Sequence, residues 1–226
     1  MAGLQDIINI ANGLTIDRRK VVGVQITRNE IPRTSFTPTR QPWRFRISVP
    51  SRLRYYDSRT LLETLDTIDR YTPQLVTFSN NPDIAWIFRY QGQLSGAQIS
   101  AITVTSFIGN QLVLDVSGVT AASSTVIFEP NDLIQIGAYT YPYTSTTQIL
   151  RGSGSSVTVT TNRPNIVSAS VVGAGLTVGN ACTFNMFCPN MPTYRLVPGG
   201  YVPGLNNALI EFSDDFEFME FVGAAP

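Results

Sequence analysis

The sequence contains no histidine, two cysteines and a single lysine among its 226 residues. Without histidine the chain cannot build Ser-His-Asp or Cys-His nucleophilic sites, and it lacks the commonest general base near neutral pH. Two cysteines without histidine also fall short of the usual ligand set of a transition metal. We therefore expect no catalytic residues, no metal site and no cofactor, and the chain is predicted not to be an enzyme.

Carboxylates are the reactive groups that remain, since glycosidases use them alone. Asp115, Glu129 and Asp132 fall in neighbouring predicted strands and could converge on one site. Their spacing does not require this, and carboxylates at turns or on edge strands are the commoner case. The glycine-rich stretch 173–179 leads into alternating, strand-like sequence, whereas a dinucleotide-binding loop opens a helix. It is interpreted as a turn, and 152–155 as a flexible hairpin tip.

Charged residues are also scarce, at 14% of the chain against about 25% in average proteins. This composition favours a surface that partners cover, although a plain β-rich protein with a Ser/Thr/Asn surface would share it. No run approaches the roughly 18 apolar residues of a membrane span. Residues 1–6 lack the basic and apolar regions of a secretory signal. We therefore expect a protein made in the cytoplasm, with no membrane partner.

The two cysteines, Cys182 and Cys188, enclose the sequence Thr-Phe-Asn-Met-Phe. On a single strand this separation spans about 20 Å, which is far beyond the reach of a disulfide. No glycine or proline lies between them to reverse the chain. We expect two reduced and mostly buried thiols.

Two helices are predicted. Residues 4–12 place Leu4, Ile7, Ile8 and Ala11 on one helical face, whose apolar stripe needs a covering surface such as a neighbouring subunit. The second helix spans about 58–70, begins at a capping residue, Asp57 or Ser58, and buries three apolar side chains. These are Leu61, Leu65 and Ile68.

The rest of the chain indicates strands. In residues 43–49, Trp43, Phe45, Ile47 and Val49 alternate with polar residues. A strand is also expected at 21–26, and after Pro73 further strands recur every eight to twelve residues. They are 74–79, 84–91, 99–107, 111–117, 124–128, 132–139, 145–151, 156–162, 166–173, 181–187, 193–197 and 207–222, the last bent at Ser213–Asp214. The best hairpin signals are Ile108–Gln111 and Arg151–Ser155. The expected fold is mainly β, a sandwich or barrel with the two short helices.

Charge divides the chain into a basic front and an acidic back. Residues 1–90 hold thirteen basic and eight acidic residues, and residues 91–226 hold three basic and eight acidic ones. We expect an N-terminal helical arm, a basic β unit with the helix, and a β-rich extension with the C-terminal strands. Their ranges are 1–19, 20–96 and 97–226, and 20–226 could equally form one domain. Opposite charge at the two ends favours head-to-tail association of copies.

Arginines and carboxylates concentrate in two segments. Arginine makes planar, bidentate pairs suited to interfaces, and residues 40–59 are arginine-rich while 211–220 are acidic. The hypothesis is that these segments pair between subunits; pairing within a subunit, or a solvated face, remains open. The candidate interface residues are Arg44, Arg46, Arg52, Arg54, Asp214, Asp215, Glu217 and Glu220. Sequence-specific nucleic-acid binding is not expected, because the net charge is zero and aromatic residues and arginines alternate onto opposite faces.

Several segments resemble tail-tube and baseplate structural proteins of tailed bacteriophages. The resemblance extends diffusely over residues 20–222 and includes the leucine-rich helix. The segments that carry it most clearly are Gln41–Pro50, Asn131–Ile136, Tyr141–Thr144 and Phe212–Glu220.

This resemblance implies a structural β-sandwich or barrel subunit of the virion tail, with no catalytic residues. Such subunits assemble into a ring, usually a hexamer, around a DNA channel, and rings stack through loops and β-hairpins. The implied partners are further copies, other tail or baseplate proteins, and DNA passing without sequence recognition. Asp214, Asp215 and Glu217 are candidates to face the lumen. The N-terminal helix and the arginine-rich unit depart from a plain tube subunit and favour a baseplate or tube-initiating ring.

The alternative is a ligand-binding β-module, such as a carbohydrate-binding or fibre-tip domain. It would expose aromatic side chains on one face. Tyr139, Tyr141 and Tyr143 alternate onto one face and keep this alternative open. Trp43 and Trp86 are both predicted to lie in the core, because each sits among apolar residues.

Overall fold

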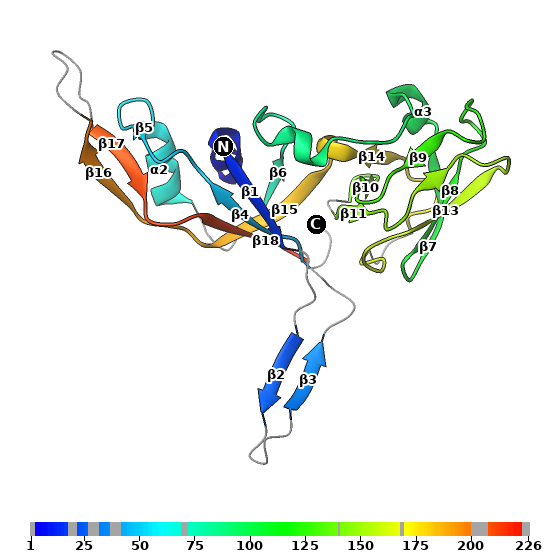
Figure 1. Ribbon diagram of the computed structural model, residues 1–226, viewed down its shortest axis with the longest axis horizontal. Coiled ribbons are helices and arrows are strands. Elements are labelled where there is room, and N and C mark those ends of the chain that lie inside the picture. The colour runs from blue at the N-terminus through cyan, green and yellow to red at the C-terminus, as the bar shows by residue number, and fades with distance from the viewer. Residues whose placement is uncertain are drawn as a thin grey trace. The chain divides into compact units, whose positions relative to one another are not determined.

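The computed structural model (Figure 1) describes most of the chain. The described residues are 3–17, 22–26, 32–36, 42–68, 72–139, 141–167, 170–199 and 208–222. They form several antiparallel sheets and three short α-helices, which confirms the predicted mainly-β class. Within these ranges, no helix is long and apolar enough to cross a membrane.

The chain folds into two compact units, each built from separate stretches of sequence. Unit 1 comprises Met1–Ile16, Arg44–Arg89 and Asn180–Phe221, and unit 2 comprises Asp17–Trp43, Tyr90–Gly179 and Val222–Pro226. These bounds differ from the expected ranges 1–19, 20–96 and 97–226. The difference arises because strands near the C-terminus pair with strands near the N-terminus, a long-range contact that a change of composition does not reveal.

Unit 1 contains a five-stranded sheet. Its strands, in spatial order, are β1 (Gly13–Asp17), β4 (Arg44–Ser48), β18 (Phe216–Glu220), β15 (Thr183–Asn190) and β6 (Gln74–Thr77). The alternation predicted for β4 is confirmed, since Phe45 and Ile47 are buried and lie opposite Phe218 and Phe216 of β18. The ring of Phe45 makes edge-on contacts at 5.2 Å with Phe184 and with a further core phenylalanine. This face of the sheet is therefore the core of unit 1.

Helix α1 (Leu4–Ile10) packs within this unit. Its predicted stripe, Leu4, Ile7, Ile8 and Ala11, is buried, and the helix contacts β6 and β15. The buried Asn81 side chain donates to the carbonyls of Ile8 at 2.6 Å and Ala11 at 2.8 Å, which satisfies the end of the helix. The stripe is thus covered by its own chain, so it needs no neighbouring subunit.

Two predictions in unit 1 need correction. Helix α2 (Arg59–Thr67) begins after Ser58 as predicted, but it buries Leu62 and Leu65, and Leu61 is half-buried. The range 84–91 is not a strand: η1 (Ala85–Phe88) is a 3-10 turn. A short apolar run has no period long enough to separate strand from helix, so the local sequence did not decide between them.

A second sheet in unit 1 has three strands. They are β16 (Tyr194–Pro198), β17 (Ala208–Phe212) and β5 (Leu53–Arg54), in that order. The predicted bend within 207–222 is confirmed, because β17 ends at Phe212 and β18 begins at Phe216. One sequence stretch therefore supplies a strand to each sheet of the unit.

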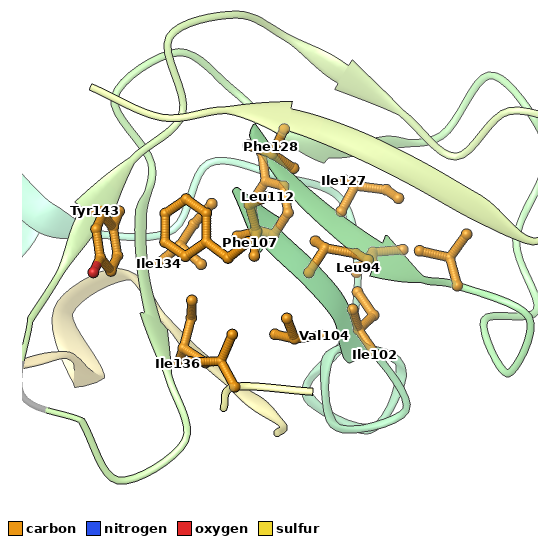
Figure 2. Packing of buried hydrophobic residues seen from close by; sticks show 14 of the residues in the cluster. Leu94, Ile102, Val104, Phe107, Leu112, Ile127, Phe128, Ile134, Ile136 and Tyr143 are labelled. Carbon is orange, nitrogen blue, oxygen red and sulfur yellow. The ribbon is translucent and has the colours of Figure 1, made fainter. Parts of the chain in front are cut away.

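Besides a two-stranded sheet formed by 22–26 and 32–36, unit 2 contains three small sheets, helix α3 (Gly96–Ser100) and part of a 3-10 turn, η2 (Gly179–Ala181). Their strands are β7 (Thr103–Ile108), β8 (Gln111–Asp115) and β13 (Ser156–Thr160); β10 (Leu133–Ile136), β11 (Tyr143–Thr144) and β14 (Leu176–Val178); and β9 (Val126–Phe128) and β12 (Ile149–Leu150). Figure 2 shows side chains such as Val104, Phe107 and Leu112 meeting in one apolar cluster. This cluster is the core of unit 2.

The two predicted hairpins have different outcomes. The Ile108–Gln111 hairpin is confirmed: Ile108 pairs with Gln111, and Gly109 takes a φ of 59°, which a glycine adopts without strain. The Arg151–Ser155 hairpin is confirmed only at its base, where Ser145 bridges Thr161 and the Thr146 amide donates to the Thr160 carbonyl at 2.9 Å. Nearer the turn, β12 pairs with β9 and β13 pairs with β8. Two other predicted strands also fail in part: 99–107 begins as helix α3, and the described residues of 166–173 are not in a strand.

Strands β2 (Val22–Ile26) and β3 (Pro32–Phe36) form a two-stranded sheet of their own. Their register runs from Val22 opposite Phe36 to Ile26 opposite Pro32. In the part of the chain that the structure describes, no third strand joins this sheet.

Both cysteines are buried, as expected. Cys182 directly precedes β15 and is 1% exposed, and Cys188 lies within β15 and is 0% exposed. Such thiols act as small apolar core groups.

Candidate assembly surfaces

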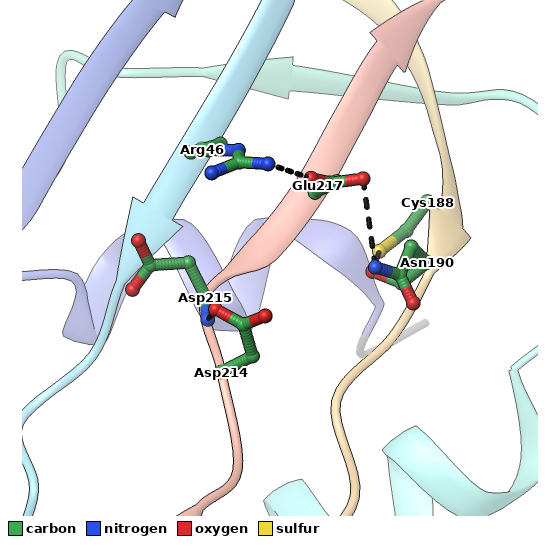
Figure 3. Close-up of polar contacts among 6 residues, drawn as sticks. All are labelled: Arg46, Cys188, Asn190, Asp214, Asp215 and Glu217. Carbon is green, nitrogen blue, oxygen red and sulfur yellow. Dashed lines mark hydrogen bonds and ion pairs between the residues drawn. The ribbon is translucent and has the colours of Figure 1, made fainter.

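Arg46 and Glu217 are brought together within one chain. They lie opposite each other on β4 and β18, and Arg46 Nη2 is 2.6 Å from Glu217 Oε1. The second carboxylate oxygen accepts from Asn190 Nδ2 on β15 at 3.5 Å, as Figure 3 shows. The arginine-rich and acidic segments therefore meet within one subunit at this point. For Arg46 and Glu217, the alternative of pairing within a subunit holds.

The other predicted interface residues lie in different surroundings. Arg44 lies opposite Met219 and is half-buried. Glu220 is buried, with an exposed fraction of 2%, opposite Met186. A buried carboxylate is not available to a neighbouring subunit, so Glu220 does not qualify as an exposed interface residue.

Four of the predicted residues remain accessible. Arg52 and Arg54 are exposed; Arg54 lies in β5 and Arg52 directly precedes it. Asp214 is exposed and Asp215 half-buried in the turn between β17 and β18, where the Asp215 amide donates to the Asp214 carboxylate at 2.8 Å. Their role between subunits stays a prediction.

The aromatic residues change roles relative to the sequence prediction. Tyr141 and Tyr143 are buried, each with an exposed fraction of 1%, so they do not form a surface platform with the half-buried Tyr139. Trp43 is in the core as predicted, and its indole donates to the Pro142 carbonyl at 3.0 Å. The prediction for Trp86 is wrong: this side chain is 68% exposed on η1.

The carboxylates considered for catalysis have structural partners. Asp132 accepts from the amides of Gln91 and Glu129, both at 2.8 Å, and burial raises its pKa despite these donors. Asp115 accepts from the Ser117 amide, which lowers its pKa. Among the described residues, no group of three or more His, Cys, Asp or Glu side chains could hold a metal. Asp115 thus accepts from an amide of its own turn, whereas Asp132 also joins segments 41 residues apart through Gln91.

A shallow groove runs between α2 and β16 in unit 1. Three hollows share Tyr194 in their walls. Those of about 310 and 240 Å³ are also lined by α2, and that of about 360 Å³ lies between β16 and β17. The Tyr194 hydroxyl donates to Asp66 on α2 at 3.4 Å. Desolvation and then the negative charge of Asp66 raise the pKa of Tyr194. Glu63 contributes a second exposed carboxylate to the same wall.

Two basic side chains, Arg59 and Arg195, also line this groove. The Arg59 guanidinium lies over the rings of Tyr55 and Tyr56, at 5.2 and 5.3 Å from their centroids. Arg195 donates to Glu211 Oε2 at 2.7 Å. Arg59 keeps its positive charge over these rings, but the carboxylates of Asp66 and Glu63 outnumber it, so the α2 side of the groove has a net negative charge.

Strand β16 forms the outer edge of its sheet. The Ser213 amide donates to the Thr193 carbonyl at 2.8 Å, which makes them a hydrogen-bonded pair. In an antiparallel ladder such pairs alternate with non-bonded ones, so Tyr194 and Leu196 direct their backbone groups away from β17. Two further observations agree with this alternation of bonded and non-bonded pairs. The Ala208 carbonyl accepts from the Tyr55 amide on the β5 side, and its partner on β16, Pro198, has no N–H to donate.

Sequence reasoning did not find this groove. Its walls come from α2, β16 and β17, which are distant in sequence and meet only through folding. One available signal was Pro198 at the end of the predicted strand 193–197, since proline within a sheet is confined to edges, ends and bulges. Comparison with protein-family models and with curated proteins gave no match.

Proposed function

We propose that the chain is a ring-forming structural subunit of a bacteriophage tail, in the baseplate or tail tube, which helps to enclose the DNA channel by self-assembly. The observation that carries this proposal is the β2–β3 hairpin, whose described strands pair only with each other. An isolated two-stranded hairpin is marginally stable in water at best. A subunit that keeps one needs a surface to receive it, and in a ring or stack a neighbouring copy supplies that surface.

Two further features support a structural role. The five-stranded sheet of unit 1 ends at β1 and β6 in the described chain, and strand edges that pair between subunits are protected from aggregation. The charge division of the sequence favours head-to-tail contacts between unlike surfaces, and such heterologous contacts form rings when the rotation between copies closes.

Mass photometry of the purified chain at micromolar concentration tests the proposal, together with negative-stain microscopy. The expected result is a closed ring with one dominant mass. A clean monomer over the whole concentration range would contradict self-assembly. Sedimentation at about 50 mM and about 1 M salt then tests the charged contacts, because screening weakens exposed ion pairs; an oligomer that is unchanged at high salt would exclude them as the main contact.

A further inference from the structure

The outer edge of β16 is unprotected in the described chain. By the pairing phase of the sheet, Tyr194 and Leu196 each point one N–H and one C=O away from β17. Open backbone groups of this kind are a template for an added strand. A binding strand can therefore form up to four hydrogen bonds along this edge.

The side chains beside this edge are suited to an added strand. Tyr194 and Leu196 lie on the same face of β16, because residues two apart share a face, and Tyr194 reaches α2 at Asp66. Their exposed fractions are 36% and 50%. A strand laid against β16 would cover this apolar surface, and basic side chains on it would meet the exposed carboxylates of Asp66 and Glu63.

The chain itself carries a segment with matching properties. The described strands β2 and β3 form a sheet that lacks a third strand, and residues 18–40, which contain them, hold six basic residues and one acidic residue. Arg33 lies within β3 itself. Backbone pairing and charge thus favour the same occupant.

We propose that the edge of β16 and the acidic groove beside α2 accept the β2–β3 hairpin of a second copy of this chain by strand addition. This inference rests on the self-assembly proposed above and adds to it the receiving surface. The added strand extends the sheet β16-β17-β5 across the subunit boundary. Because the donor and acceptor surfaces differ, the contact is heterologous and repeats from copy to copy.

Disulfide trapping between separately made chains tests the contact. One chain carries Leu196→Cys, and the other carries a single cysteine at Val24 or Gln25 of β2, or at Thr34 or Ser35 of β3. Adjacent positions cover both faces of each strand. Cysteines opposite each other on paired strands come within disulfide distance, and the native thiols are buried. A size tag on one chain identifies the mixed dimer.

The matched control places cysteine at Ile108, which is 78% exposed at the tip of another hairpin. With at least one of the hairpin cysteines, we expect Leu196→Cys to form the mixed dimer at least about tenfold faster than Ile108→Cys does. The reason is that a docked strand holds the two thiols at a high effective concentration. Equal rates would overturn the proposal. A disulfide that forms only within a double-cysteine chain would overturn the second copy as the occupant.

A charge reversal tests the acidic groove independently. Asp66→Lys is compared with Asp83→Lys, an exposed carboxylate of the same unit outside the groove. We expect Asp66→Lys to weaken self-association about fivefold, the scale of one exposed ion pair, and Asp83→Lys to leave it unchanged.

The outcomes separate this inference from the proposed function. If the rings persist, but trapping shows no excess at Leu196 and the Asp66→Lys variant behaves like the Asp83→Lys variant, the receiving surface is wrong and the ring remains. If the wild-type chain stays monomeric up to about 100 μM and no mixed dimer is trapped, both proposals fail. Mixed dimer in a chain that makes no closed ring would support the receiving surface alone.

Discussion

Arg46 and Glu217 lie opposite each other on β4 and β18, and their side chains meet at 2.6 Å on the face of the sheet that points away from the core. One residue along each strand, Phe45 and Phe218 form the corresponding pair on the buried face. The same two strands therefore hold an exposed ion pair and a core contact in adjacent rows.

These two rows should differ in their effect on stability. The Arg46 and Glu217 side chains are 62% and 37% exposed, so Glu217→Gln should lower the free energy of unfolding by about 1 kcal/mol or less. Phe45→Ala removes a buried ring and should cost about 3–5 kcal/mol. Urea unfolding followed by circular dichroism measures both. A loss with Glu217→Gln as large as that with Phe45→Ala would mean that the polar contacts, including Asn190, stabilise the sheet.

A close approach in unit 2 gives a second prediction. A Cβ atom at Gly92 would lie well within 3.0 Å of both the Tyr90 hydroxyl and the Ile127 carbonyl oxygen, which share a hydrogen bond. Gly92→Ala should therefore destabilise the protein by about 1–3 kcal/mol through overpacking. Gly96→Ala is the control, because a Cβ atom there meets nothing within 4 Å, and its stability should not fall.

The Tyr90 hydroxyl reports on the same contact. Burial raises the pKa of Tyr90 to about 12. In Gly92→Ala the displaced hydroxyl should gain solvent, and its pKa should move back towards 10.0, the ordinary tyrosine value. Absorbance titration of the tyrosinate, with Tyr90→Phe to identify the signal, measures the shift. An unchanged titration alongside unchanged stability would show that the backbone makes room for the methyl group.

Local patterns predicted the elements whose burial alternates along one strand. The β4 alternation was readable because one face is core and the other carries Arg46. The strand predicted at 84–91 is wrong, because the apolar run Ile84–Phe88 has no period that separates strand from helix. The turn depends instead on contacts around the buried Asn81.

The candidate site was only partly readable for a different reason. The charge pattern identified the segments of Arg46 and Glu217, but their register joins residues 171 positions apart, and nothing local sets it. The groove beside Tyr194 has the same origin, since Asp66 reaches it from 128 residues away. Long-range pairing therefore decides which of the charged residues are neutralised within the chain and which stay available.

The carboxylates of Asp132 and Asp115 should respond to pH in opposite directions. Burial raises the pKa of Asp132 above its ordinary 3.8, so the folded state keeps this proton to higher pH than the unfolded chain does. Its contribution to stability is then greatest at low pH and falls as pH rises through the raised pKa. The Ser117 amide lowers the pKa of Asp115, so its contribution is present above 3.8 and is lost as pH falls through the lowered pKa.

Comparing the two asparagine variants isolates these effects. From about pH 3 to about pH 7, the free energy of unfolding of wild type minus that of Asp132→Asn should decrease, and the same difference for Asp115→Asn should increase. Denaturant unfolding at each pH measures both. If the difference for Asp132→Asn instead grows with pH, the amides of Gln91 and Glu129 outweigh desolvation and the folded carboxylate is stabilised as an anion.

The two tryptophans should differ in solvent access. Trp86 is 68% exposed, and its indole is held by the Asp83 carbonyl at 2.8 Å, whereas Trp43 is 2% exposed. Acrylamide should quench one part of the native fluorescence strongly and leave the other protected, and Trp86→Phe should remove the accessible part with little loss of stability. Trp43→Phe should instead lower stability by about 1 kcal/mol, because it removes one buried hydrogen bond to the Pro142 carbonyl, which keeps the Arg163 guanidinium as its second donor at 2.8 Å. If Trp86 is already protected in assembled wild-type rings but accessible in the Asp66→Lys variant, η1 lies close to the subunit contact. If quenching is equal in both, η1 stays exposed in the assembly, and this excludes Trp86 as an interface anchor.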